Sequence, residues 1–306
     1  MNDKPKLMIT VDVEAFPKRA PDRHLDKLIW GRFTEGEGGI LAMMRIAERH
    51  GVKLTMFTDL AEVGIYGDAM IEVAQEIDRR GHDLQLHCHP EFMPMPIWTA
   101  AGVRQLRLLD TATDTQARLT VDYLLETYAR ATTKAPVAFR GGSYRFNAAL
   151  LRALKDAGVT IDSSYNPSKP KQSRVTEVRP AFSWSNGTLE LPITCLSGHN
   201  GATSLTDFNY NVGSLSTVAQ MTGYLAKFHA AAPDEVAVLV MHSWSFSKPL
   251  GGSEIVHYDR LREADVSRFD EFLGAIADHT SVITTRDISL SPADAGMRVY
   301  DLSEVN

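Results

Sequence analysis

Hydrophobic positions along this chain follow two alternating patterns. Short runs of apolar and β-branched residues, typical of buried strands, recur from one end of the sequence to the other. Longer stretches with apolar residues at helical spacing lie between most of them. The first pattern predicts strands over 6–13, 52–57, 83–89, 136–140, 159–162, 188–193, 235–241 and 281–284. The second predicts helices over 39–50, 69–80, 112–131, 147–157, 215–231 and 265–277.

Strands that alternate with helices predict an α/β fold with a parallel sheet and helices packed outside it. The number of strands favours a closed or nearly closed barrel over two separate domains. A dinucleotide-binding fold is less well supported, because no G-x-G-x-x-G follows the first strand. We therefore expect residues 1–306 to form a single catalytic domain. Two polar stretches, near 163–187 and 197–213, are expected to be irregular insertions.

Composition narrows the possible partners. The 306 residues are 44% hydrophobic and 23% charged, as in ordinary globular proteins. The net charge of −6 argues against nucleic acid as a partner. We expect no integral membrane segment, because no apolar run is long enough to span a bilayer. The absence of a secretion signal before the first strand and the presence of only two cysteines favour the reducing cytoplasm.

Polar residues follow the predicted strands at the points where these strands end. In a parallel barrel the carboxyl ends of the strands share one face, which is where barrel enzymes build their active sites. So many reactive residue types are hard to bring to strand ends by chance. These residues are Asp12, Glu14, His87, His89, Arg140, Asp162 and His242.

The spacing of these residues predicts a metal site. Residues two apart on a strand point the same way, so His87 and His89 would present two imidazoles together. Such a pair suits a divalent transition metal, most often zinc. By the same spacing Asp12 and Glu14 share a face, so one carboxylate could complete an open three-ligand site while the other acts as a base.

Each of these residues alone also has an ordinary structural explanation. Arg140 by itself would more often form a salt bridge, and Asp162 would more often cap a turn. Two buried carboxylates that lack a partner or a metal are costly, however, which favours a site over simple packing. His242 ends a very apolar run, where a polar side chain needs a hydrogen-bonding reason.

Five segments, in this order, resemble the five motifs of the polysaccharide deacetylase family, also called the NodB-homology or carbohydrate esterase family 4. They are TVDVE at 10–14, GHDLQLHCHP at 81–90, FRGG at 139–142, DSSY at 162–165 and LVMH at 239–242. The resemblance implies a distorted (β/α) barrel of about seven parallel strands. It also implies a metal-dependent deacetylase that acts on an N-acylated saccharide.

Three departures separate this chain from the usual family pattern. The histidines are two residues apart instead of four, the acids form D-x-E instead of an adjacent pair, and Gly141-Gly142 stands where a proline is common. Such D-x-E and H-x-H variants resemble a divergent branch associated with surface-polysaccharide and cell-wall gene clusters and with some amide hydrolases.

The resemblance also implies a role for each residue. The metal would be zinc, with cobalt, nickel or iron as alternatives, and Glu14 is assigned to it because Asp12 aligns with the family's base. The implied metal ligands are Glu14, His87 and His89, and the implied catalytic residues are Asp12 (base), Arg140 (orients the base), His242 (acid) and Asp162 (support). Tyr144 and Trp244 are candidate platforms for a sugar ring.

Three alternatives to a sugar deacetylase stay open. A related amidase acting on a small cyclic or linear amide would use the same residues. A non-catalytic carbohydrate-binding relative would not need both a base and an acid. A metal-stabilised structural domain is least favoured, because no closed four-ligand site is evident. The sequence specifies neither the sugar, nor the acyl group, nor the oligomeric state.

Overall fold

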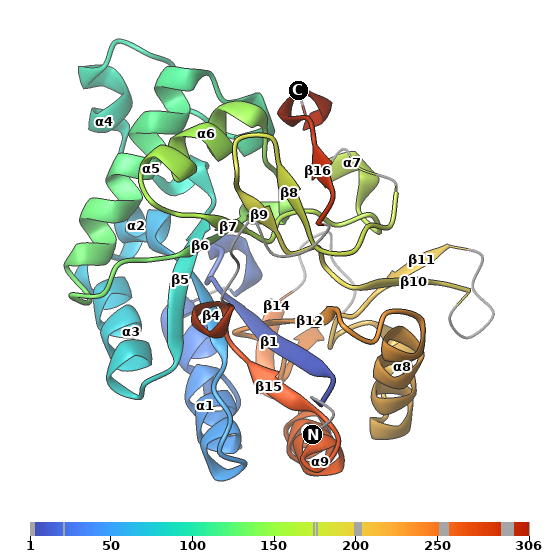
Figure 1. The fold of residues 1–306 in the computed structure, drawn as a ribbon. Helices are drawn as coiled ribbons and strands as arrows, with labels where there is room; N and C mark the ends of the chain where they lie inside the picture. Colours follow the sequence, from blue (N-terminus) through green and yellow to red (C-terminus); the bar gives the residue numbers. More distant parts are fainter. Residues whose placement is uncertain are drawn as a thin grey trace. The chain divides into compact units, whose positions relative to one another are not determined.

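The computed structural model divides into two compact units. It describes residues 4–20, 22–173, 175, 177–198, 204–250, 257–288 and 297–305. The first unit contains Met1–Met56 and Phe208–Thr284, and the second contains Phe57–Asp207 and Thr285–Asn306 (Figure 1). A single catalytic domain therefore remains a prediction.

The first unit is built on strand β1 (Lys6–Val13), in which every residue after Lys6 is buried. β1 pairs in parallel with β12 (Val236–His242) and with β15 (Ser281–Ile283), and β4 (Thr55–Asp59) is its other neighbour. Burial on both faces explains why apolar residues predominate along β1 and β12 instead of alternating strictly with polar ones. The register places Asp12 opposite His242, at the carboxyl ends of both strands.

Helices and short hairpins complete the first unit. Helix α9 packs against α1 and α8, with Phe269 and Phe272 buried in its apolar face. α8 begins with a capping box formed by Thr217 and Gln220. The elements are η1 (Pro17–Arg19), the π-helix η2 (Leu25–Trp30), β2 (Arg32–Phe33), β3 (Gly36–Glu37), α1 (Ile40–Arg49), η8 (Gly213–Leu215), α8 (Val218–Ala231), β13 (Ser247–Leu250), β14 (His257–Leu261) and α9 (Glu263–Ile276).

The sheet of the second unit runs in the order β4-β5-β6-β7-β9-β8-β16. Its members after β4 are β5 (Asp83–Cys88), β6 (Ala138–Gly141), β7 (Ile161–Asp162), β9 (Leu189–Glu190), β8 (Phe182–Trp184) and β16 (Val299–Tyr300). Parallel pairing places His87 opposite Arg140, and Asp162 opposite both Phe139 and Glu190. Only the β8–β9 pair among those described in this sheet is antiparallel. β10 (Cys195–Ser197) and β11 (Leu205–Asp207) form a separate antiparallel pair.

The helices of the second unit begin at recognisable caps. Thr113 and Gln116 form a capping box at α5, and Asn147 caps α6, which lies beside α5 (Figure 1). The elements are η3 (Leu60–Glu62), α2 (Val63–Tyr66), α3 (Asp68–Arg79), η4 (Pro90–Phe92), α4 (Met95–Ala100), η5 (Leu109–Thr111), α5 (Asp114–Ala129), η6 (Gly142–Tyr144), α6 (Ala148–Asp156), α7 (Pro170–Ser173), η9 (Thr285–Asp287) and η10 (Leu302–Val305).

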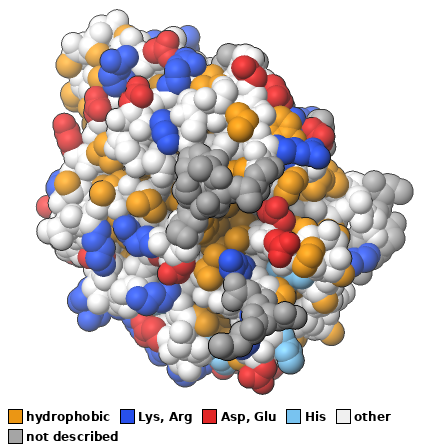
Figure 2. Space-filling view, viewed as in Figure 1, with side chains coloured by type: hydrophobic (Ala, Val, Ile, Leu, Met, Phe, Trp, Pro, Cys, Tyr) orange, Lys and Arg blue, Asp and Glu red, His pale blue; other side chains and the backbone are white. Residues whose placement is uncertain are grey.

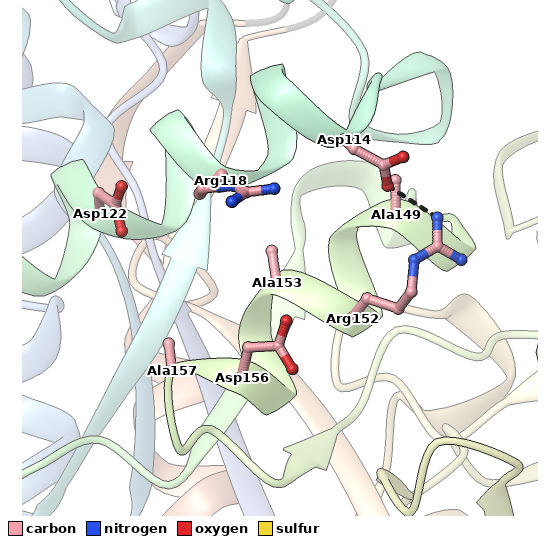
Figure 3. A pocket seen from close by; sticks show the side chains of 8 residues that line it. All are labelled: Asp114, Arg118, Asp122, Ala149, Arg152, Ala153, Asp156 and Ala157. Atoms are coloured by element: carbon pink, nitrogen blue, oxygen red, sulfur yellow. Dashed lines mark hydrogen bonds and ion pairs between the residues drawn. The ribbon is translucent and has the colours of Figure 1, made fainter.

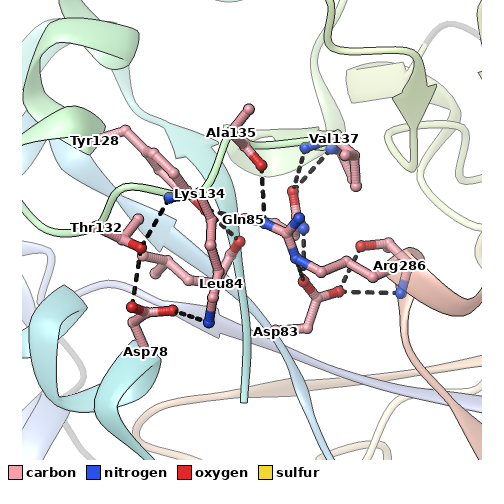
Figure 4. A network of polar contacts seen from close by, with 12 residues as sticks. Asp78, Asp83, Leu84, Gln85, Tyr128, Thr132, Lys134, Ala135, Val137 and Arg286 are labelled. Carbon is pink, nitrogen blue, oxygen red and sulfur yellow. Dashed lines mark hydrogen bonds and ion pairs between the residues drawn. The ribbon is translucent and has the colours of Figure 1, made fainter. Parts of the chain in front are cut away.

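A polar network holds the amino-terminal end of β5 (Figure 4). The Asp83 carboxylate accepts hydrogen bonds from the Thr285 backbone at 3.0 Å and from the Gln85 amide at 2.6 Å, and it pairs with Arg286 at 3.0 Å. The Gln85 side-chain oxygen accepts the backbone N–H of Val137 at 2.9 Å. The network ties the segment after β15 to the central strands of the second unit.

The long predicted elements occur where hydrophobic periodicity placed them. All six expected helices form, with ends shifted by a few residues. The stretch 163–187 contains α7 and β8, and the described part of 197–213 contains β11, so both include short regular elements. No helix among the described residues has the length and apolar character to cross a membrane.

Candidate active site

The first unit brings Asp12 and His242 together at the ends of two paired strands. They are direct partners in the β1–β12 register, and the backbone N–H of Ser243 donates to the Asp12 carbonyl at 2.9 Å. Asp12 is buried, whereas His242 is partly exposed. This edge of the first unit thus offers a carboxylate and an imidazole, the two groups most used for proton transfer at neutral pH.

Glu14 lies just beyond β1 and is held on two sides. Its carbonyl accepts a hydrogen bond from the Ser243 hydroxyl at 3.1 Å. Its side-chain Oε1 accepts one from Arg19 Nη1 at 2.5 Å, and only 3% of the Glu14 side chain is exposed. The backbone and the carboxylate of Glu14 are therefore both fixed within the first unit.

His242 stacks on Trp244. The two ring centroids are 4.2 Å apart with 21° between the planes, and the ring of Tyr258 lies 4.8 Å from that of Trp244. The His242 backbone N–H donates to Ser245 Oγ at 2.8 Å, and Ser245 Oγ donates to Asn211 at 2.5 Å. Trp244 is 8% exposed, so its indole supports the imidazole, and its contact with a sugar remains a prediction.

The second unit buries His87 and His89 at the carboxyl end of β5. Their ring centroids are 5.4 Å apart with 67° between the planes, and the two residues are 2% and 6% exposed. The His89 backbone N–H donates to both oxygens of Asp59 at 3.2 and 3.3 Å. The sequence analysis missed Asp59, although it ends strand β4 and so meets the same strand-end rule as the other candidates.

Arg140 is fully buried next to the histidine strand. It is the register partner of His87, and its Nε and Nη2 donate to the carbonyl and the hydroxyl of Ser163, both at 3.1 Å. Its guanidinium carbon lies 4.3 Å from the centre of the Phe57 ring. Arg140 thus joins the ends of β6 and β7, and its action on Asp12 remains a prediction.

Asp162 forms a buried carboxyl pair with Glu190, a residue that sequence reasoning did not select. Ser164 donates to Asp162 through its N–H at 3.1 Å and its hydroxyl at 2.9 Å, and the Trp184 indole donates to Glu190 at 3.0 Å. Burial raises the pKa of Asp162 to about 6. Burial, followed by the charge of Asp162, raises the pKa of Glu190 well above its ordinary value. Near neutral pH the pair therefore keeps one proton, as carboxyls that share a site do.

Gly142, the second of the two glycines after Arg140, makes room for His89. A Cβ on Gly142 would lie 2.6 Å from the Cys88 carbonyl oxygen and 2.8 Å from the His89 ring. The next two residues, Ser143 and Tyr144, have φ values of +55° and +60°, which are uncommon for residues other than glycine. Close approach to the H-x-H strand end explains Gly142. Tyr144 is 8% exposed, and its contact with a sugar remains a prediction.

A cavity of about 500 Å³ lies elsewhere in the second unit, between α5 and α6 (Figure 3). Its charged lining consists of three aspartates and two arginines, with Arg152 paired to Asp114 at 2.8 Å. None of the strand-end residues lines it. This groove therefore does not belong to the candidate active site.

The described residues include a candidate group of metal ligands, Glu14, His87 and His89, all of them buried. One carboxylate and two imidazoles are the donor set of many catalytic zinc sites. The residues present therefore fit a divalent transition metal by their chemistry.

Comparison with solved structures shows the fold. No protein-family profile and no curated protein matches the chain. A candidate polysaccharide deacetylase from Mycobacterium smegmatis superposes with a TM-score of 0.57 over 94% of this chain and 90% of that one, at 16% identity. The chain has the polysaccharide deacetylase fold. The predicted α/β class, that of a distorted barrel, is thereby confirmed.

The polysaccharide deacetylase fold also matches part of a different enzyme. A 4-alpha-glucanotransferase from Thermococcus litoralis gives a TM-score of 0.56 at 14% identity, and this chain spans 41% of its length. The reaction must therefore be argued from the residues of this chain, because the same fold serves different chemistries.

Proposed function

We propose that this protein is a metal-dependent hydrolase that removes an acyl group, an acetyl group in the simplest case, from an N-acylated sugar. The observation that carries the proposal is the pairing of Asp12 with His242 at the carboxyl ends of β1 and β12. A fixed carboxylate and imidazole can supply the base and the acid that amide hydrolysis needs.

Glu14, His87 and His89 would hold the metal, with zinc favoured and cobalt, nickel or iron as alternatives. When bound, such an ion supplies Lewis acidity, which makes water more acidic and polarises an amide carbonyl. Three protein ligands leave a coordination position for this chemistry, whereas structural zinc sites use four.

The chain's own residues would move the protons. Asp12 takes a proton from the attacking water as the new carbon–oxygen bond forms, and His242 donates one to the sugar nitrogen as the carbon–nitrogen bond breaks. The Trp244 stack keeps the imidazole in place for that transfer, and Ser245 holds the backbone N–H of His242. Arg140 would orient Asp12, and Asp162 would support this arrangement from behind.

The substrate class follows from the family resemblance and from the aromatic residues near the strand ends. Tyr144 and Trp244 would contact the sugar ring, and a surface-polysaccharide or glycan precursor is the proposed substrate. We propose the cytoplasm as the location of the protein. Both cysteines are free buried thiols in the structure. The net charge of −6 does not favour a polyanionic substrate, and Figure 2 shows Lys and Arg intermixed with Asp and Glu on the face in view.

The test is release of acetate from N-acetylated sugars by the protein loaded with zinc or cobalt. Asp12→Asn and His242→Gln should each lower kcat/KM roughly 100- to 10,000-fold while metal content stays constant. Asp278→Asn and His279→Gln, on exposed side chains of the first unit, are matched controls that should retain full activity. Release of amine from small amides but not from sugars would favour the amidase. No hydrolysis of either class by the loaded protein would contradict the proposal.

A further inference from the structure

The turn after β1 carries Arg19, a side chain that has no role in the proposed function so far. Phe16 adopts φ +50°, an uncommon conformation for an aromatic residue, and η1 follows it. The Arg19 backbone N–H donates to the Phe16 carbonyl at 2.9 Å. This tight turn directs Arg19 back onto Glu14, five residues earlier in the chain.

The guanidinium of Arg19 is held by more than its ion pair. Its central carbon lies 4.7 Å from the centre of the Phe16 ring and 4.4 Å from that of Trp244. Only 24% of the Arg19 side chain is exposed, so the pair with Glu14 is largely withdrawn from water. Stacking on two aromatic rings restricts an arginine more than a single surface ion pair does.

Arg19 therefore connects two parts of the first unit's edge. It bonds Oε1 of the proposed metal ligand Glu14, and it stacks on the indole that itself stacks on His242. The carboxylate and the imidazole are consequently positioned by contacts to one shared pair of side chains, Arg19 and Trp244.

We infer that Arg19 is a positioning residue that limits Glu14 to binding the metal through a single carboxylate oxygen. A carboxylate can bind a metal through one oxygen or both, and hydrogen bonds to ligating carboxylates tune this choice. With Oε1 bonded to Arg19, Glu14 would bind the metal through Oε2 alone. A coordination position then stays available for water and substrate, as a catalytic site requires. The inference rests on the proposed function.

The test uses the full chain loaded with Co²⁺, whose visible absorption weakens as its coordination number rises. Arg19→Ala should weaken this absorption relative to the parent, because Glu14 can then bind through both oxygens. It should also lower kcat at least about tenfold with little change in KM, as expected when an outer contact of a metal site is lost. Arg19→Lys, which keeps a donor for Oε1, should restore most of the parent spectrum.

Arg23→Ala is the matched control, because Arg23 lies in the same loop and pairs with Asp26 on the surface. Its spectrum and kcat should equal those of the parent. An Arg19→Ala protein with the parent spectrum and parent kcat would overturn the inference. So would tighter cobalt binding with undiminished kcat, since Arg19 would then compete with the metal. A parent protein that binds no cobalt would instead overturn the proposed function itself.

Discussion

The two ends of strand β5 carry buried polar residues for different reasons. At the amino-terminal end, Asp83 accepts hydrogen bonds from a backbone N–H and two side chains and also pairs with Arg286 (Figure 4). At the carboxyl end, His87 and His89 are just as buried, next to Asp59 and against Gly142. β5 therefore carries a buried carboxylate at its amino-terminal end and two buried imidazoles at or just beyond its carboxyl end.

The contrast teaches that burial alone does not distinguish a site from a structural network. The Asp83 network uses its polar groups to fasten the segment at Thr285 to the sheet, which stabilises the fold. The histidine end places two potential metal ligands on the edge where barrel enzymes build their sites. Substitutions at the two ends should therefore change different properties.

The largest expected effect is on catalysis. His89→Ala should lower acyl release at least about 100-fold, because a metal ligand is lost while the strand itself remains. Steady-state kinetics on an N-acetylated sugar and thermal unfolding of the metal-free protein would measure both properties. Activity within a few-fold of the parent would contradict a catalytic role for the carboxyl end of β5.

Asp83→Ala should lower stability and leave the metal content unchanged. Removing a buried acceptor that serves several donors should lower the free energy of unfolding by about 3 kcal/mol. Urea unfolding would measure it, with Asp122→Asn on the exposed face of α5 as a control. Metal content of the folded fraction should stay at the parent value, and a loss of metal would mean that the two ends are not independent.

Gly142→Ala should moderately lower both stability and metal binding. Its new methyl group would overlap the Cys88 carbonyl and the His89 ring, so we expect a loss of about 2 kcal/mol in stability. Displacement of His89 should also weaken cobalt binding about tenfold, measured by titration. Gly223→Ala in helix α8, where a Cβ meets nothing within 4 Å, should instead stabilise by about 0.5–1 kcal/mol. Equal behaviour of the two variants would contradict the close approach at His89.

The smallest effect concerns pH. The folded-state pKa values of Asp162 and Glu190 are both raised by burial, that of Asp162 to about 6. Groups with raised values favour the folded state at low pH and lose that contribution as pH rises through the folded-state pKa. Stability of the parent should therefore fall as pH rises from the ordinary carboxyl range through about 6, the folded-state pKa of Asp162, and above that only through the higher folded-state pKa of Glu190. Glu190→Gln should flatten this decline, which melting temperatures between pH 5 and 9 would reveal, and an unchanged slope would contradict the shared-proton pair.

Periodicity was sufficient to predict the long elements and the strand ends. β1 and β12 are apolar along nearly their whole length, so their limits and the positions of Asp12 and His242 could be predicted directly. β9 lies within the strand predicted over 188–193, but the short strand β8 could not be predicted, because three residues carry no measurable period.

The missed site residues depend on tertiary pairing. Glu190 meets Asp162 only through the β7–β9 register, and Arg19 reaches Glu14 only because Phe16 takes an uncommon backbone conformation. Asp59 is different, since the strand-end rule that selected Asp12 applies to it as well. A predicted strand that ended at residue 57 instead of Asp59 hid it from that rule.

The most direct test of the central claim is the metal content of the purified protein after incubation with zinc and removal of the excess. The account predicts close to one zinc per chain in the parent and almost none in a His87→Ala, His89→Ala double variant that remains folded. A parent protein without zinc, or a double variant that retains it, would contradict a hydrolase built on Glu14, His87 and His89.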